Sequence, residues 1–143
     1  MLLRKLRTAW RLSPEARSQF RTAYLLLFWI AIAMHLRGLR WTRQRLRRWS
    51  DSPSNPRPDG LKTTLAMVRL AVRYSPWANC LRQSLTLWTM LRWQGMATEL
   101  RIGLRRVEGK VESHAWLEYQ GQVIGDRPDV QQDYRAFEAA IEL

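Results

Sequence analysis

The chain has 143 residues, of which 46% are hydrophobic, and this balance excludes wholesale disorder and fits a single folded unit. The formal net charge is +12. Most of it lies in residues 1–49, which hold 12 Lys and Arg against one acidic residue, Glu15. A region this basic favours anionic partners such as acidic peptides, polyanions or lipid head groups.

The numbers of cysteine and histidine residues limit the kinds of covalent link and metal site that the chain can form. Cys80 is the only cysteine, so a disulfide within the chain is excluded, and we expect a reducing, cytoplasmic location. One cysteine and two histidines cannot form a closed tetrahedral metal shell without carboxylates. We therefore expect neither a metal nor a cofactor.

The first predicted helix begins at Ser13-Pro14-Glu15, where a capping hydroxyl precedes a proline and an acid, and it ends near Gly38. Its apolar run, residues 24–34, is shorter than the roughly 20 residues that a spanning helix needs. Arginines close both ends of the run, which is also unlike a secretory signal. A helix that is buried or docked on a partner is therefore favoured over one on a membrane surface. Residues 39–49 predict a second short helix.

A change of composition predicts a boundary near residue 58. Residues 50–60 contain three prolines and read as a linker. We expect a basic, apolar N-terminal helical arm with its linker over residues 1–58. A folded domain of nearly neutral charge should follow over residues 59–143.

Within residues 59–143, the spacing of apolar residues changes from a helical period to a strand period. Helical spacing comes first, with Gly95 as a C-terminal cap, and an alternating pattern follows. Helices followed by a small antiparallel sheet predict an α+β fold. The expected elements are helices over 61–74 and 80–93, strands over 97–104, 111–119 and 122–126, and a closing helix over 134–141.

Cys80 lies where a nucleophile is expected. Pro76 and Asn79 predict a turn directly before the helix, so Cys80 falls in the first helical turn. There the unpaired backbone N–H groups and the helix dipole favour a thiolate. The competing interpretation is a buried structural cysteine. A histidine and an aspartate further along the chain favour catalysis.

His114 and Asp126 complete a possible Cys-His-Asp triad. Cys80 would attack a carbonyl, His114 would carry the proton to the leaving group, and Asp126 would orient the imidazole. A three-residue loop, 119–121, would place His114 opposite Asp126 on one face of the sheet. A two-residue loop at 120–121 would place them on opposite faces. The position of the glycine favours the three-residue loop.

Other polar residues are weaker candidates for the site. The backbone N–H of Cys80 is a reasonable donor to an oxyanion. A structural role as a cap, loop residue or helix residue is the more typical one for the remaining candidates. These are Asn79 and Gln83 as side-chain donors to the oxyanion, Asp129 and Asp133 as alternative carboxylates, and His35 as an alternative catalyst.

Three motifs together resemble the transglutaminase-like, papain-like cysteine proteases of lasso-peptide biosynthesis. They are Cys80-Leu-Arg-Gln-Ser-Leu-Thr-Leu to Gly95, Glu99-Leu-Arg-Ile-Gly-Leu104, and His114-Ala-Trp-Leu-Glu118 followed by Gly121 and Asp126. The resemblance covers about residues 61–137, and more loosely the apolar N-terminal helix. It implies an α+β fold with the nucleophile's helix packed on an antiparallel sheet. It also implies that Cys80, His114 and Asp126 are nucleophile, base and acid.

The resemblance further implies a substrate and partners. These bacterial proteases cut the leader peptide from a ribosomally made precursor. In the split form, a separate leader-recognition protein delivers the leader, and an ATP-dependent lasso cyclase closes the ring on the released core. Residues before 61 lack the length and composition of a recognition module, so we expect the split form. The arm is then a candidate docking surface for the recognition protein, the leader or the cyclase.

Two other functions stay open. The same triad can run a transglutaminase-type acyl transfer, because an amine can resolve the thioester in place of water. A non-enzymatic protein that binds nucleic acid or a membrane is the other, since residues 40–49 interleave arginine with tryptophan. No recognisable nucleic-acid module accompanies them. We therefore expect no nucleic-acid partner, and contact with a membrane surface is possible but not favoured.

Overall fold

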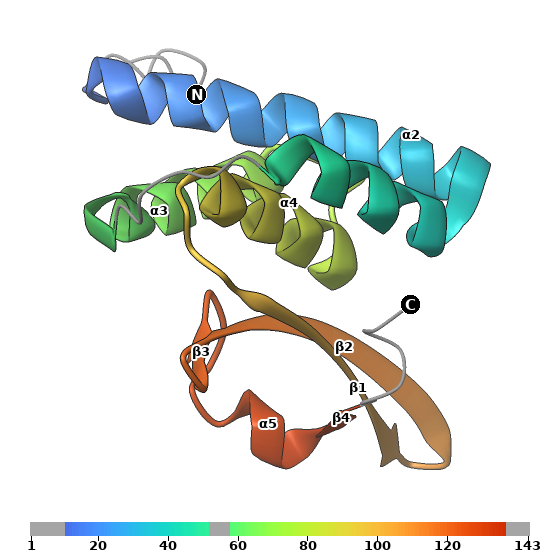
Figure 1. Ribbon diagram of the computed structural model, residues 1–143. Coiled ribbons are helices and arrows are strands. Elements are labelled where there is room, and N and C mark those ends of the chain that lie inside the picture. Colours follow the sequence, from blue (N-terminus) through green and yellow to red (C-terminus); the bar gives the residue numbers. More distant parts are fainter. Residues whose placement is uncertain (1–10, 52–57, 137–143) are drawn as a thin grey trace.

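The computed structural model describes residues 11–51 and 58–136. Helices form one side of the molecule and a four-stranded sheet forms the other (Figure 1). This confirms the predicted α+β fold. The elements are α2 (Pro14–Ser50), η1 (Pro58–Gly60), α3 (Leu61–Arg73), α4 (Cys80–Trp93), β1 (Glu99–Val107), β2 (Lys110–Tyr119), β3 (Gln122–Ile124), α5 (Val130–Asp133) and β4 (Arg135–Ala136).

α2 consists of two helical segments that meet at Gly38. The helix begins as predicted, because Ser13 Oγ accepts a hydrogen bond from the N–H of Ala16 at 3.1 Å. Gly38 has φ 77° and ψ 176°, a conformation that glycine adopts readily and that breaks the helical path. The chain reverses direction there (Figure 1). The predicted stop near Gly38 and the second helix after it are therefore confirmed.

The inner face of α2 belongs to the main hydrophobic core. Ala23, Leu27 and Ile30 are fully buried, and they lie in one cluster with Leu85 and Leu91 of α4. Burial of this kind is the main stabilising contribution to a small domain. The predicted boundary near residue 58 thus separates two segments of sequence that share a core.

The sheet is antiparallel, in the order β3-β2-β1-β4. A two-residue turn joins β2 to β3, because Tyr119 pairs with Gln122. The predicted three-residue loop is therefore wrong. Gln120 and Gly121 both have positive φ, 51° and 77°, and a two-residue turn of this kind matches the twist of the flanking strands, which type I or II turns would splay.

The C-terminal prediction is also wrong where the structure describes it. The closing helix was expected over residues 134–141, but the helix α5 ends at Asp133 and Arg135–Ala136 forms β4. Tyr134 is already extended, and β4 pairs with the edge of β1. The remainder of that prediction, and residues 52–57 of the predicted linker, lie outside the described residues.

Substitution of Leu27 tests whether α2 is part of the core. Leu27→Ala should lower the free energy of unfolding by about 2–5 kcal/mol, because its side chain is 0% exposed. Leu25→Ala is the matched control and should change that free energy by about 0.5 kcal/mol or less, because Leu25 is 65% exposed. Urea unfolding followed by circular dichroism measures both. Equal, small effects would show that α2 is dispensable for the core.

Candidate active site

Cys80 is the first residue of α4. The side chain of Asn79 caps the helix, with Oδ1 accepting the N–H of Arg82 at 2.9 Å. The Arg82 guanidinium also donates to the carbonyl of Trp77, which holds the loop that precedes the cysteine. The thiol is free and partly exposed. Its own backbone N–H lies in the first turn, where no intrahelical acceptor exists.

A contact between α4 and β2 brings Cys80 near the histidine. Ser84, one turn after Cys80, donates its hydroxyl to the carbonyl of Ala115 at 3.0 Å. β3 pairs with residues 117–119 of β2 only, so it does not pair with β2 beside residue 114. A small cavity of about 40 Å³ lies there. Its lining includes Cys80, Gln83, Ser84, Leu87, His114, Ala115, Trp116, Leu117, Ile124, Gly125 and Asp126.

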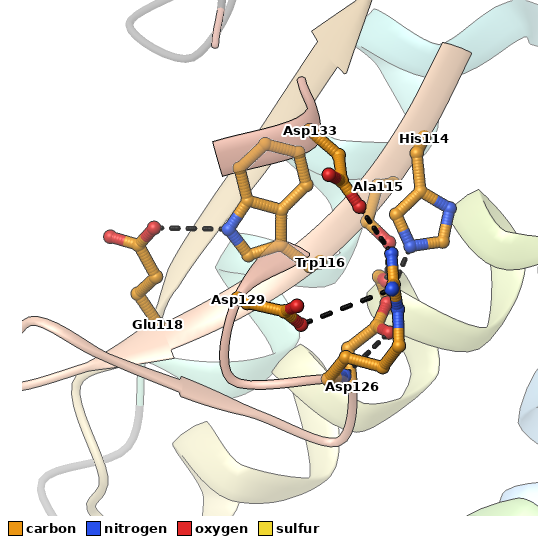
Figure 2. A network of polar contacts seen from close by, with 9 residues as sticks. His114, Ala115, Trp116, Glu118, Asp126, Asp129 and Asp133 are labelled. Atoms are coloured by element: carbon orange, nitrogen blue, oxygen red, sulfur yellow. Dashed lines mark hydrogen bonds and ion pairs between the residues drawn. The ribbon is translucent and has the colours of Figure 1, made fainter. Parts of the chain in front are cut away.

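His114 and Asp126 form a hydrogen-bonded pair. His114 Nε2–H donates to Asp126 Oδ2, as the dashed line in Figure 2 shows. The second carboxylate oxygen, Oδ1, accepts the backbone N–H of Arg127 at 2.7 Å. Because Nε2 faces the carboxylate, Nδ1 is the ring nitrogen that remains for a thiol proton.

Gly125 explains how Asp126 reaches His114 despite the two-residue turn. Strand alternation would have placed the two side chains on opposite faces. Instead β3 ends at Ile124, and Gly125 turns the chain with φ 77°. A Cβ at Gly125 would lie only 2.9 Å from Leu87 Cδ2. The pairing thus depends on a tight glycine bend against α4, and no extension of the sheet is involved.

The two alternative carboxylates have a different partner. Asp133 and Asp129 flank Arg127, with ion-pair distances of 2.5 and 3.9 Å (Figure 2). The hydrogen bond to Asp133, followed by the charge of Asp129, raises the pKa of Arg127. Both acids therefore hold the loop that carries Asp126, which agrees with the loop role expected for them.

The ring of His114 forms a cluster with two aromatic side chains that the sequence interpretation did not select. Trp116 lies nearly parallel to it, with ring centroids 6.3 Å apart and an interplanar angle of 19°. The Tyr134 ring lies 5.2 Å from the His114 ring and 6.3 Å from the Trp116 ring, measured between centroids. Trp116 is itself fixed by donation from Nε1 to Glu118 Oε1 at 3.0 Å (Figure 2). These contacts limit how far the imidazole can rotate.

Gly103 makes room for this aromatic packing. It stands directly opposite His114 in the pairing of β1 with β2. A Cβ there would lie 2.7 Å from Tyr134 Cβ and 2.9 Å from the ring of Trp116. An isolated glycine inside a strand is the sequence signal for such a close approach.

The two remaining polar candidates, Gln83 and His35, lie in different parts of the molecule. Gln83 lines the cavity together with Cys80. His35 is exposed on α2, away from the residues that line the cavity. Among residues 11–51 and 58–136, no group of three or more His, Cys, Asp or Glu side chains is arranged to hold a metal ion. The described arrangement offers a candidate nucleophile in Cys80, a proton carrier in His114 and an orienting carboxylate in Asp126.

Comparison with known proteins gives one match. The family model described as the transglutaminase-like superfamily matches residues 25–139. The match begins within α2 and extends through the whole cavity lining. Neither the curated proteins nor the solved structures gave a match.

Substitution of Gly125 tests whether the bend holds the pair together. Gly125→Ala should reduce the alkylation rate of Cys80 by iodoacetamide several-fold, because the overlap with Leu87 moves Asp126 and releases the imidazole. The matched control is Gly109→Ala, which has a similar φ of 79° but no atom within 4 Å of the added Cβ. It should lower stability by about 1 kcal/mol and leave alkylation unchanged. Equal alkylation rates in the two variants would contradict this role of Gly125.

Proposed function

The chain belongs to the transglutaminase-like superfamily, and we propose that it is a cysteine peptidase that removes the leader from a ribosomally made lasso precursor peptide. The superfamily includes cysteine peptidases and acyltransferases and generally uses a catalytic cysteine. One observation carries the proposal. A thiol at a helix N-terminus shares a cavity with a histidine that is hydrogen bonded to a carboxylate.

The geometry supports a two-step hydrolysis. His114 takes the thiol proton at Nδ1, and the Cys80 thiolate attacks the peptide carbonyl. The backbone N–H of Cys80 faces the developing oxyanion. The intermediate collapses to a thioester as the imidazolium gives its proton to the leaving amine. His114 then deprotonates a water, which attacks the thioester, and the thiol is regenerated as the acid leaves.

Asp126 and the aromatic packing set the state of the histidine during these steps. The carboxylate accepts from Nε2 and so fixes the tautomer that offers Nδ1 to the thiol. Its negative charge also stabilises the imidazolium that forms in both steps. Trp116 and Tyr134 hold the ring in that orientation. The residues proposed as catalytic are therefore Cys80, His114 and Asp126.

The surroundings of the site favour an extended peptide as substrate. The cavity, about 40 Å³, has room for the reacting group but not for a bulky ligand. The neighbouring edge of β2 is not paired by β3 beside His114. An unpaired strand edge can align an extended chain through its backbone groups, here other than the Ala115 carbonyl, which accepts from Ser84. A leader peptide crossing this edge would present its scissile carbonyl to Cys80.

The partners follow from the resemblance in the motifs around the triad. We propose that a separate leader-recognition protein delivers the precursor, and that the ATP-dependent lasso cyclase uses the released core, in the cytoplasm of a bacterium. Acyl transfer is the second candidate function, since the superfamily includes acyltransferases. A thioester would form on the partly exposed thiol of Cys80, where an amine could replace water.

Mass spectrometry of the precursor peptide tests the function. The wild-type chain, incubated with the precursor and its recognition protein, should give one cut and a free leader. Cys80→Ala should give no product while keeping its circular dichroism spectrum. Asp126→Asn should lower turnover by a factor on the order of 10²–10⁴, because the imidazole loses its orienting charge. Arg106→Gln, on an exposed residue outside the cavity lining, is the control that should cut normally.

Two outcomes would contradict the proposal. Cleavage by Cys80→Ala at the wild-type rate would make Cys80 a structural residue. A product joined to an added amine, with no free leader, would assign the same triad to acyl transfer.

A further inference from the structure

An apolar stripe runs along the outer face of α2. Four large side chains, at spacings of three and four residues, lie on one side of the helix. Their exposed fractions are far above those of core residues, at 65% for Leu25, 47% for Phe28, 43% for Ile32 and 70% for Leu36. A contiguous exposed apolar surface of this kind marks an interaction site.

The stripe lies on the outermost layer of the molecule. α2 covers α3 and α4 on the side away from the sheet (Figure 1). The side chains stand on a single helix and so form a convex ridge. A ridge suits a soft surface into which it can sink, and an amphipathic helix at a membrane interface buries its apolar face in that way.

Positive charge borders the stripe. Arg21 and Arg17 are exposed about one and two turns before Leu25, respectively, close to the same helical face. Arg37 and Arg40 are exposed around the kink at the other end. Over residues 14–50 the only acidic residue is Glu15. Each arginine near an anionic membrane surface adds electrostatic attraction, while its stem can pack along the acyl boundary.

The second segment of α2 continues this chemistry with tryptophan. Trp41 and Trp49 are both partly exposed. The guanidinium of Arg37 lies 5.7 Å from the ring of Trp41, and that of Arg45 lies 5.3 Å from the ring of Trp49. Tryptophan is enriched at the level of lipid head groups, because its ring is apolar and its N–H is polar.

The cations of this segment also repel one another. Burial first, and then the neighbouring charges of Arg47 and Arg92, lower the pKa of Arg43. An anionic surface nearby would relieve this repulsion. A neutral or cationic partner would leave it in place.

From the stripe, its arginines and its tryptophans, we propose that α2 binds the surface of an anionic membrane and lies in the plane of the interface. By length and composition α2 could also span a membrane. Its opposite face, however, contains Leu27 and Ile30, which are fully buried in the core with α4. Spanning would require α2 to leave that core, whereas lying on the surface keeps it. The proposal is independent of the reaction at Cys80.

Vesicle co-sedimentation with the full-length chain tests this surface. Wild-type protein should bind vesicles of phosphatidylcholine with about one third phosphatidylglycerol, and bind pure phosphatidylcholine vesicles much more weakly. The double variant Leu25→Ser/Leu36→Ser should bind the anionic vesicles at least tenfold more weakly, because two inserted side chains are lost. Arg17→Gln/Arg21→Gln should weaken binding by about tenfold and reduce its salt dependence.

Matched controls separate this effect from general loss of apolar surface or charge. Val111→Ser removes a side chain that is 60% exposed on β2, and Arg106→Gln removes an exposed charge on β1. Both should bind vesicles as the wild type does. All variants alter exposed residues, and unchanged thermal unfolding verifies that each one folds.

Three results would overturn the proposal. The first is equal binding of the wild type to neutral and anionic vesicles. The second is unchanged binding of Leu25→Ser/Leu36→Ser. The third is no vesicle binding together with a dimer in sedimentation velocity that the same double variant turns into a monomer, since the stripe would then be an interface between two copies of the chain.

Discussion

The packing of α4 on β2 is the contact on which the candidate site depends. The hydroxyl of Ser84 reaches the carbonyl of Ala115, and Leu85 is buried in the same core as Ala115. This fixes the first turn of α4, and with it Cys80, beside the strand that carries His114. Leaving this buried hydroxyl without its acceptor would cost free energy. The hydrogen bond therefore favours one position of α4 along β2 and one rotation of the helix about its axis. The thiol and the imidazole come from elements that are far apart in sequence and are brought to one cavity by this single interface.

The other half of the site depends on where the sheet stops. β3 has three residues, and the glycine that follows it turns Asp126 back toward His114. A longer β3 would have covered the edge of β2 and carried the aspartate to the wrong face. The short strand therefore has two consequences, since it leaves β2 unpaired by β3 beside His114 and frees the carboxylate from strand alternation. The alternation of residues along a strand predicts which face a side chain occupies while the strand is paired. It no longer applies once the pairing ends, as it does here after Ile124.

Much of the molecule follows from local patterns in the sequence. The start of α2 at Ser13, its break at Gly38, and the cap of α4 at Asn79 each rest on interactions between near neighbours in the chain. The sequence patterns also point to the three residues of the candidate triad, although the three-residue turn that they predict between His114 and Asp126 is wrong. What the sequence could not give is packing across long separations. Gly103 and Trp116 acquire their roles only once β1 lies beside β2.

The position of α2 also depends on packing across long separations. The helix connects its own exposed apolar face with the loop that precedes Cys80. Its apolar run read as one hydrophobic segment, yet it has a core face at Leu27 and an exposed face at Leu25. Phe28, on the exposed side, also contacts Trp77 with ring centroids 5.3 Å apart. The carbonyl of Trp77 accepts a hydrogen bond from the guanidinium of Arg82. The backbone N–H of Arg82 in turn donates to the side chain of Asn79, which caps α4. The outer face of α2 and the first turn of the Cys80 helix are therefore linked by three successive contacts, through Phe28, Trp77 and Arg82.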